Sequence, residues 1–171
     1  MYKWLKPTLC LKGFEQLTPT LLHGLGIKAL LLDVDNTLSD GHGLPIAPEV
    51  QKHLELLKEE SFLLCILSNN GEERVGTFAA PLGLEYIAHA KKPSSEGVLR
   101  ALSLLQVEAS ETLMVGDQLF TDIWGGNRAG IQTALVQPRG GAEPWYIQLK
   151  RALERPFIKR ILADTSVLRG E

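Results

Sequence analysis

The run KALLLDVDNTL, residues 28–38, decides the fold class of this chain. Its apolar half, residues 29–32, has no polar interruption, which is typical of a strand buried on both faces of a parallel sheet. Asp33 and Asp35 follow where such a strand would end. Two carboxylates this close repel each other unless a cation joins them, so the pair indicates a functional site. The competing interpretation is a turn with solvated aspartates.

Outward from this run, short apolar segments alternate with amphipathic ones. Strands are predicted at residues 28–34, 61–67, 85–88, 112–115 and 131–136. Helices are predicted at residues 48–60, at 71–82, after a capping Ser94 or Ser95, and at 120–129, where Gly130 ends the helix. This alternation predicts an α/β fold, a doubly wound, Rossmann-like parallel sheet of about five strands with helices on both faces. We expect one domain over residues 1–171, with its core at about 28–136.

Polar residues follow the predicted strands, and the carboxyl ends of parallel strands share one edge of a sheet. Ser68 and Asn69 follow the second strand, and a hydroxyl beside backbone N–H groups suits a phosphate oxygen. Lys92, or its neighbour Lys91, follows the third strand and could neutralise a phosphoryl group. Taken singly, these residues also fit a helix cap and a solvated loop charge. Their convergence on one edge favours a phosphate site.

The fourth strand is followed by GDQLFTD, residues 116–122. Its glycine allows a close turn of the backbone. Asp117 and Asp122 offer carboxylate oxygens, the ligands that Mg²⁺ prefers. The sequence therefore predicts a magnesium site beside the phosphate site.

These four motifs, in this order, resemble those of the haloacid dehalogenase superfamily of phosphohydrolases. The resemblance implies that Asp33 is a nucleophile that becomes an aspartyl-phosphate and that Asp35 is the general acid/base. It also implies that Lys92, directly before Pro93, is the motif lysine, with Lys91 as the alternative. The remaining implied roles are phosphate binding by Ser68, and metal binding by Asp33, by the backbone carbonyl of Asp35, by Asp117 and by Asp122. Residues 41–43, GHG, fit the small flap of this superfamily, in which His42 either touches substrate or is merely exposed.

The spacing of the motifs bears on substrate size. Twenty-nine residues lie between Leu38 and Ser68, and 23 lie between Ser68 and Lys92, and a helix and a strand are predicted in each interval. An independent domain needs roughly 50 residues or more, so we expect no large cap domain over the site. An open site suits a phosphate on a large object, such as a phospholipid headgroup.

A narrower resemblance points in the same direction. The run at residues 116–130, together with Lys92-Pro93, resembles subfamily IIIA, the branch that includes the phosphatidylglycerophosphate phosphatases. The implied substrate is phosphatidylglycerophosphate. A soluble sugar-phosphate or nucleotide phosphatase is the alternative. A non-catalytic phosphoacceptor module is disfavoured, because it needs an aspartate after the third strand, where residues 89–92 read HAKK.

Charge and cysteine content set the remaining expectations. The net charge of -2 argues against nucleic acid as a partner. Two isolated cysteines fit a reducing, cytoplasmic compartment. The tail at about 145–162 is basic and amphipathic, so it could bind peripherally to an anionic membrane. The alternative is a helix that packs on the sheet with a solvated basic face. Pro156 predicts two short helices or a kink.

Overall fold

The computed structural model describes residues 3–41, 46–140, 145–164 and 167–169. Its centre is a seven-stranded, all-parallel sheet of order β4-β3-β2-β5-β6-β1-β7. The strands are β1 (Leu9–Leu11), β2 (Ala29–Leu32), β3 (Leu63–Leu67), β4 (Glu85–Ile87), β5 (Thr112–Gly116), β6 (Gln132–Val136) and β7 (Leu168–Arg169). The five predicted strands are confirmed. The short strands β1 and β7 extend the sheet beyond β6 and were not predicted.

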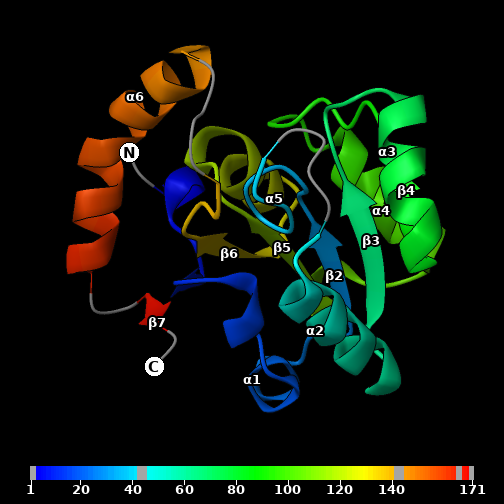
Figure 1. Ribbon diagram of the computed structural model, residues 1–171. Helices are drawn as coiled ribbons and strands as arrows, with labels where there is room; N and C mark the ends of the chain where they lie inside the picture. The colour runs from blue at the N-terminus through cyan, green and yellow to red at the C-terminus, as the bar shows by residue number, and fades with distance from the viewer. Residues whose placement is uncertain (1–2, 42–45, 141–144, 165–166, 170–171) are drawn as a thin grey trace.

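The helices cover both faces of the sheet (Figure 1), as the doubly wound fold requires. They are α1 (Pro19–Gly24), α2 (Pro48–Glu59), α3 (Glu72–Ala79), α4 (Glu96–Leu105), α5 (Trp124–Arg128) and α6 (Trp145–Ala163). Short 3-10 turns lie at Lys3–Leu5, Phe14–Gln16, Ala80–Leu82 and Ala109–Glu111, and a π-type turn at Leu119–Ile123. Gly130 follows Ala129, the C-cap residue of α5, and has a φ of 77°, as its predicted position at the end of the helix needs.

Alternation along β2 divides the core into two layers. Leu30 and Leu32 join α1, α2 and α3 in one apolar cluster. Leu31 points to the other face and packs with α4. Helix α6 and the Leu119–Ile123 turn form a third cluster on that second face. Because β2 is fully buried on both sides, the direction of the strand end that carries Asp33 is fixed by packing.

The order of the strands places the site. Strand β2 lies between β3 and β5, and Leu31 is level with Cys65 on one side and Met114 on the other. The chain moves outward from β2 through β3 to β4 and then crosses back to β5. The carboxyl ends of β2 and β5 therefore flank the point where the winding reverses, which is where open parallel sheets bind ligands. Asp33 and Asp117 lie directly after these two ends.

The C-terminal tail forms one helix, α6, that contains Pro156. Of the two predicted alternatives, two short helices are not observed. Instead, the single helix bends along its length (Figure 1). Glu154 and Ile161 are buried, so part of α6 packs against the body of the protein. No helix among the described residues is long and apolar enough to cross a membrane.

Candidate active site

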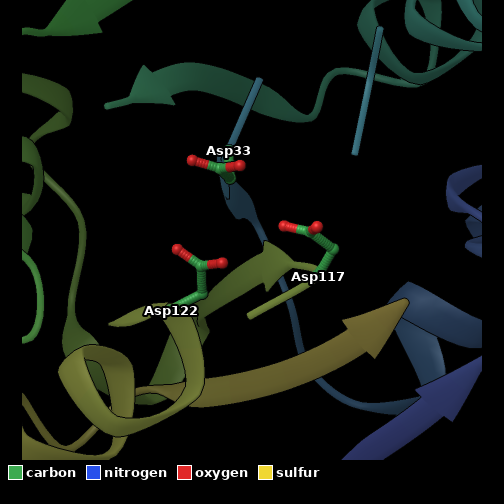
Figure 2. Close-up of side chains that lie close together, drawn as sticks. All are labelled: Asp33, Asp117 and Asp122. Carbon is green, nitrogen blue, oxygen red and sulfur yellow. The ribbon is translucent and has the colours of Figure 1, made fainter. Parts of the chain in front are cut away.

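Three carboxylates from two loops converge at the edge of the sheet. Asp33, Asp117 and Asp122 each offer an oxygen, and these three atoms lie within 4.8 Å of one another. Figure 2 shows the three side chains pointing toward a common space from the ends of β2 and β5 and from the following turn. The sequence prediction that these residues form one cluster agrees with this geometry.

Gly116 permits the close approach of Asp122. A Cβ atom built at Gly116 would lie 2.3 Å from Oδ2 of Asp122. The same carboxylate oxygen accepts a hydrogen bond of 3.1 Å from the N–H of Gln118. The loop that carries Asp117 thus folds back on itself, and only a glycine leaves room for it to do so.

Lys92 provides the positive charge at the centre of the cluster. Its Nζ lies 2.6 Å from Oδ1 of Asp33, 2.7 Å from Oδ1 of Asp122 and 2.8 Å from the carbonyl oxygen of Leu67. Its side chain is 3% exposed. Lys91, by contrast, is exposed and pairs with Glu96 at 3.1 Å. Of the two candidates for the motif lysine, the geometry supports Lys92.

The burial of these charges changes how they titrate. Burial raises the pKa of Asp33 well above its ordinary value, with Asp122 and Asp117 adding to the rise and Lys92 opposing it. Burial also raises the pKa of Asp117 to about 7. For Lys92, burial lowers the pKa, but the nearby Asp122 and Asp33 raise it by more. Lys92 therefore stays charged, whereas the carboxylates need more positive charge than the protein supplies.

The second motif forms a clamp on Lys92. Nδ2 of Asn69 donates to the carbonyl oxygen of Lys92 at 3.0 Å, and the N–H of Lys92 donates to Oδ1 of Asn69 at 2.7 Å. The Asn69 side chain thus holds the Lys92 backbone, and phosphate binding by Asn69, which also lines the pocket, stays a prediction. The buried Ser68 hydroxyl accepts hydrogen bonds from the N–H and Nδ2 of Asn70. Ser68 lines the pocket beside Asp33, where a phosphate oxygen could reach it.

Asp35 is half-buried, and its carboxylate is held by two side chains outside the cluster of Asp33, Asp117 and Asp122. Its Oδ1 accepts a 2.6 Å hydrogen bond from Nη2 of Arg74, and its Oδ2 accepts one of 3.0 Å from Nδ2 of Asn70. Sequence reasoning missed Arg74, because a basic residue in an amphipathic helix such as α3 carries no sign of its partner. Held in this way, Asp35 lines the pocket that it shares with Asp33.

Three residues of helix α6 tie it to the loop after β5 by polar contacts. Arg151 donates to the carbonyl oxygen of Asp117 at 2.7 Å and also pairs with the Asp117 carboxylate. Lys150 donates to Oε1 of Gln118 at 3.2 Å. The buried Glu154 accepts the N–H of Phe120 at 2.9 Å. Two of the basic residues that the sequence suggested for a membrane surface are therefore engaged at the active site.

The pocket above Asp33 has a volume of about 260 Å³. Asp33, Ser68 and Lys92 line its floor, and Tyr146, Ile147 and Lys150 of α6 line its side. A larger cavity of about 760 Å³ lies on the other flank of α6, against the ends of β1 and β6. Its walls are mostly apolar, and Asp117 and Arg151 are among the residues that line it. The smaller pocket is the one that Asp33, Asp35, Ser68 and Lys92 line together. His42, in the predicted flap, lies outside the described residues.

The cluster fits a hard divalent cation. Its donors are carboxylate oxygens, and among the described residues no histidine or cysteine belongs to it. Such a donor set suits Mg²⁺ and not zinc. Asp33, Asp117 and Asp122 would hold the ion, and Arg151 would have to share Asp117 with it.

Comparison with known proteins identifies relatives of the chain. Residues 40–130 match the family model described as haloacid dehalogenase-like hydrolase. The chain is 32% identical to the "Probable phosphatase YqeG" of Bacillus subtilis over 159 residues, which cover 93% of this chain and 92% of that protein. It is 28% identical to the chloroplastic/mitochondrial phosphatidylglycerophosphate phosphatase 1 of Arabidopsis thaliana over 166 residues. That match covers 91% of this chain and 48% of the Arabidopsis protein.

Solved structures agree on the fold. The cobalt-bound deoxy-D-mannose-octulosonate 8-phosphate phosphatase of Haemophilus influenzae superposes with a TM-score of 0.55 at 18% identity. The superposition covers 73% of this chain and 75% of that one. At this identity the likeness concerns the α/β architecture alone.

Proposed function

Because this chain belongs to the haloacid dehalogenase-like hydrolases, we propose that it hydrolyses phosphomonoesters through a phosphorylated Asp33. The single observation that carries the proposal is the position of Asp33. Its carboxylate lies at the end of the central strand, 2.6 Å from the Lys92 ammonium, on the floor of a pocket that Asp35 and Ser68 also line.

The proposed reaction has two displacements. In the first, an oxygen of Asp33 bonds to phosphorus while the bond from phosphorus to the alcohol oxygen breaks, and Asp35 gives that oxygen a proton. In the second, Asp35 takes a proton from water, the water oxygen bonds to phosphorus, and the Asp33–phosphorus link breaks. Lys92 and the Ser68 hydroxyl hold the phosphoryl oxygens throughout.

We propose Mg²⁺ as the cofactor, held by Asp33, Asp117 and Asp122, with the backbone carbonyl of Asp35 as a further ligand. When bound, the ion offsets the negative charge of the carboxylates and of the phosphoryl group. The raised pKa values of Asp33 and Asp117 support this, since they mark a site short of positive charge.

For the substrate, we propose a phospholipid headgroup, phosphatidylglycerophosphate being the candidate. The similarity to the Arabidopsis enzyme extends over 91% of this chain. The intervals in which a cap could be inserted contain α2 and α3. A site without a large cap leaves room for a headgroup presented at a membrane surface. A soluble sugar-phosphate or nucleotide phosphatase is the alternative.

Helix α6 has a face that suits the surface of an anionic bilayer. Trp145, Leu149 and Leu153 recur at four-residue spacing and are 76%, 55% and 58% exposed. Arg155, Lys159 and Arg160 are exposed on the same helix. Apolar residues next to basic ones are typical of helices that lie in a membrane interface. Since the first turns of α6 also line the catalytic pocket, docking this face would bring the pocket to the lipid.

The substrate assignment is tested by phosphate release from a panel of compounds. We expect Mg²⁺-dependent release from phosphatidylglycerophosphate in vesicles to exceed release from sugar phosphates and nucleotides. Comparable or faster release from a soluble monoester would favour the alternative, and release from none of them would refute the enzyme proposal.

Membrane docking is tested by co-sedimentation with anionic vesicles. A Leu149→Ala/Leu153→Ala protein should bind them less than the unchanged protein does. The matched control is Leu99→Ala/Leu104→Ala, which removes two leucines of α4 that are 54% and 45% exposed. If both double variants sediment equally, α6 does not dock in this way.

A further inference from the structure

The catalytic pocket contains a second cation that the proposed chemistry does not use. Among its described lining residues the cations are Lys92 and Lys150. Lys92 is committed to the floor, where Asp33, Asp122 and the carbonyl oxygen of Leu67 surround its ammonium. Lys150 comes from α6 and stands at the side of the pocket.

The contacts of Lys150 leave its charge available to a ligand. Its ammonium donates a hydrogen bond of 3.2 Å to Oε1 of Gln118, a neutral amide oxygen, which does not cancel the charge. The nearest acid on the same helix, Glu154, is buried and accepts the N–H of Phe120. Lys150 is half-buried, so an anion beside it would be screened less than at an open surface.

The position of this lysine is fixed by its neighbours. One residue along α6, Arg151 is bound to the carbonyl oxygen of Asp117 at 2.7 Å, and Glu154 holds the next part of the same loop. Since these two contacts hold α6 against the loop directly after Lys150, the backbone of Lys150 is fixed beside the pocket. A cation held in place in this way can discriminate between ligands.

We propose that Lys150 forms a second anion subsite, which binds a phosphodiester group of the substrate while the terminal phosphomonoester lies on Asp33 and Lys92. The inference rests on the proposed function and narrows it to substrates that carry two phosphate groups. The terminal phosphate and phosphodiester of phosphatidylglycerophosphate are joined by one glycerol unit. The subsite would make such a headgroup a better substrate than a simple phosphomonoester.

The test uses two soluble substrates, so that no membrane is involved. One is glycerophosphoglycerol phosphate, the deacylated headgroup, and the other is glycerol 3-phosphate, which lacks the phosphodiester. The unchanged protein should prefer the first by about tenfold or more in kcat/KM. Lys150→Gln should reduce that preference about tenfold by raising the KM for glycerophosphoglycerol phosphate. Lys150→Arg should keep most of the preference. The matched control, Lys52→Gln, removes an exposed lysine of α2 that does not line the pocket and should keep the preference.

The subsite can also be tested by measuring binding in a protein that does not turn the substrate over. Calorimetric titration of glycerophosphoglycerol phosphate into Asp33→Asn protein should show about tenfold weaker binding once Lys150→Gln is added. The subsite would be overturned if Asp33→Asn protein bound glycerophosphoglycerol phosphate equally well with and without Lys150→Gln. It would also be overturned if Lys150→Gln reduced kcat/KM equally for both substrates. Hydrolysis of the soluble headgroup without hydrolysis of vesicle lipid would leave the subsite standing and refute the lipid assignment.

Discussion

Replacing Lys92 with methionine should destabilise the protein far more than the same change one residue earlier. The Lys92 ammonium lies 2.6 Å from Asp33 and 2.7 Å from Asp122, with side-chain exposures of 3%, 12% and 1% for the three residues. At an effective dielectric constant of about 20, each contact corresponds to roughly 6 kcal/mol of attraction, much of it offset by the cost of burying the charges. Removing one partner of such a buried group costs about 3–5 kcal/mol. Lys91 pairs with Glu96 at the surface, where a pair contributes about 0–1 kcal/mol.

The assay is urea unfolding of the unchanged protein, Lys92→Met and Lys91→Met in metal-free buffer at pH 8. The free energy of unfolding should fall by about 3–5 kcal/mol for Lys92→Met and by less than about 1 kcal/mol for Lys91→Met. The loss should shrink as the pH falls. Without Lys92 the pKa of Asp33, already raised by burial, rises further, and the folded protein recovers stability by binding a proton. Equal losses for the two variants, or a loss that grows at lower pH, would refute this electrostatic account.

Two further predictions concern the metal loop. In thermal-shift assays, Mg²⁺ should raise the melting temperature more at pH 8 than at pH 6, because burial raises the pKa of Asp117 to about 7 and the proton competes with the ion. An equal rise at both pH values would contradict this, and so would an undiminished rise in the Asp117→Ala protein. Gly116→Ala should destabilise the protein by at least about 2 kcal/mol, because the new Cβ would lie 2.3 Å from Asp122. In the control, Gly24→Ala, the new Cβ would have no atom within 4 Å, so this change should leave the stability unchanged or raise it by about 0.5–1 kcal/mol. Calorimetry distinguishes the pair, and similar melting temperatures would show that the loop tolerates the methyl group.

The alternation of apolar and amphipathic segments was enough to predict the five central strands and the edge at which the site lies. The residues of β2 are apolar throughout, so this strand could be recognised without knowledge of its neighbours in the fold. The carboxyl ends of parallel strands lie at the same edge of a sheet, so the position of the site followed. Strands β1 and β7 escaped prediction because they are very short and pair through contacts between the two ends of the chain. Leu9 is level with Ala134 on one side and Leu168 on the other.

Within the site, sequence predicted the residues whose chemistry follows from their place after a strand: Asp33, Ser68, Lys92 and Asp117. Partners supplied by helices were not predictable. Arg74 meets Asp35, and Arg151 meets Asp117, because of how α3 and α6 are packed. A basic amphipathic tail has the same composition whether it faces lipid or an acidic loop, so the ion pair at Asp117 became apparent only in the structure.

The central claim is that Asp33 becomes phosphorylated during turnover. It is tested most directly by mixing the protein with Mg²⁺ and a phosphomonoester, quenching in acid, reducing with borohydride, and mapping the peptides by mass spectrometry. Reduction of an acyl-phosphate converts that aspartate to homoserine. The account predicts homoserine at position 33, and none after Asp33→Asn. Homoserine at Asp35 or Asp117, or turnover with no trapped residue at all, would contradict it.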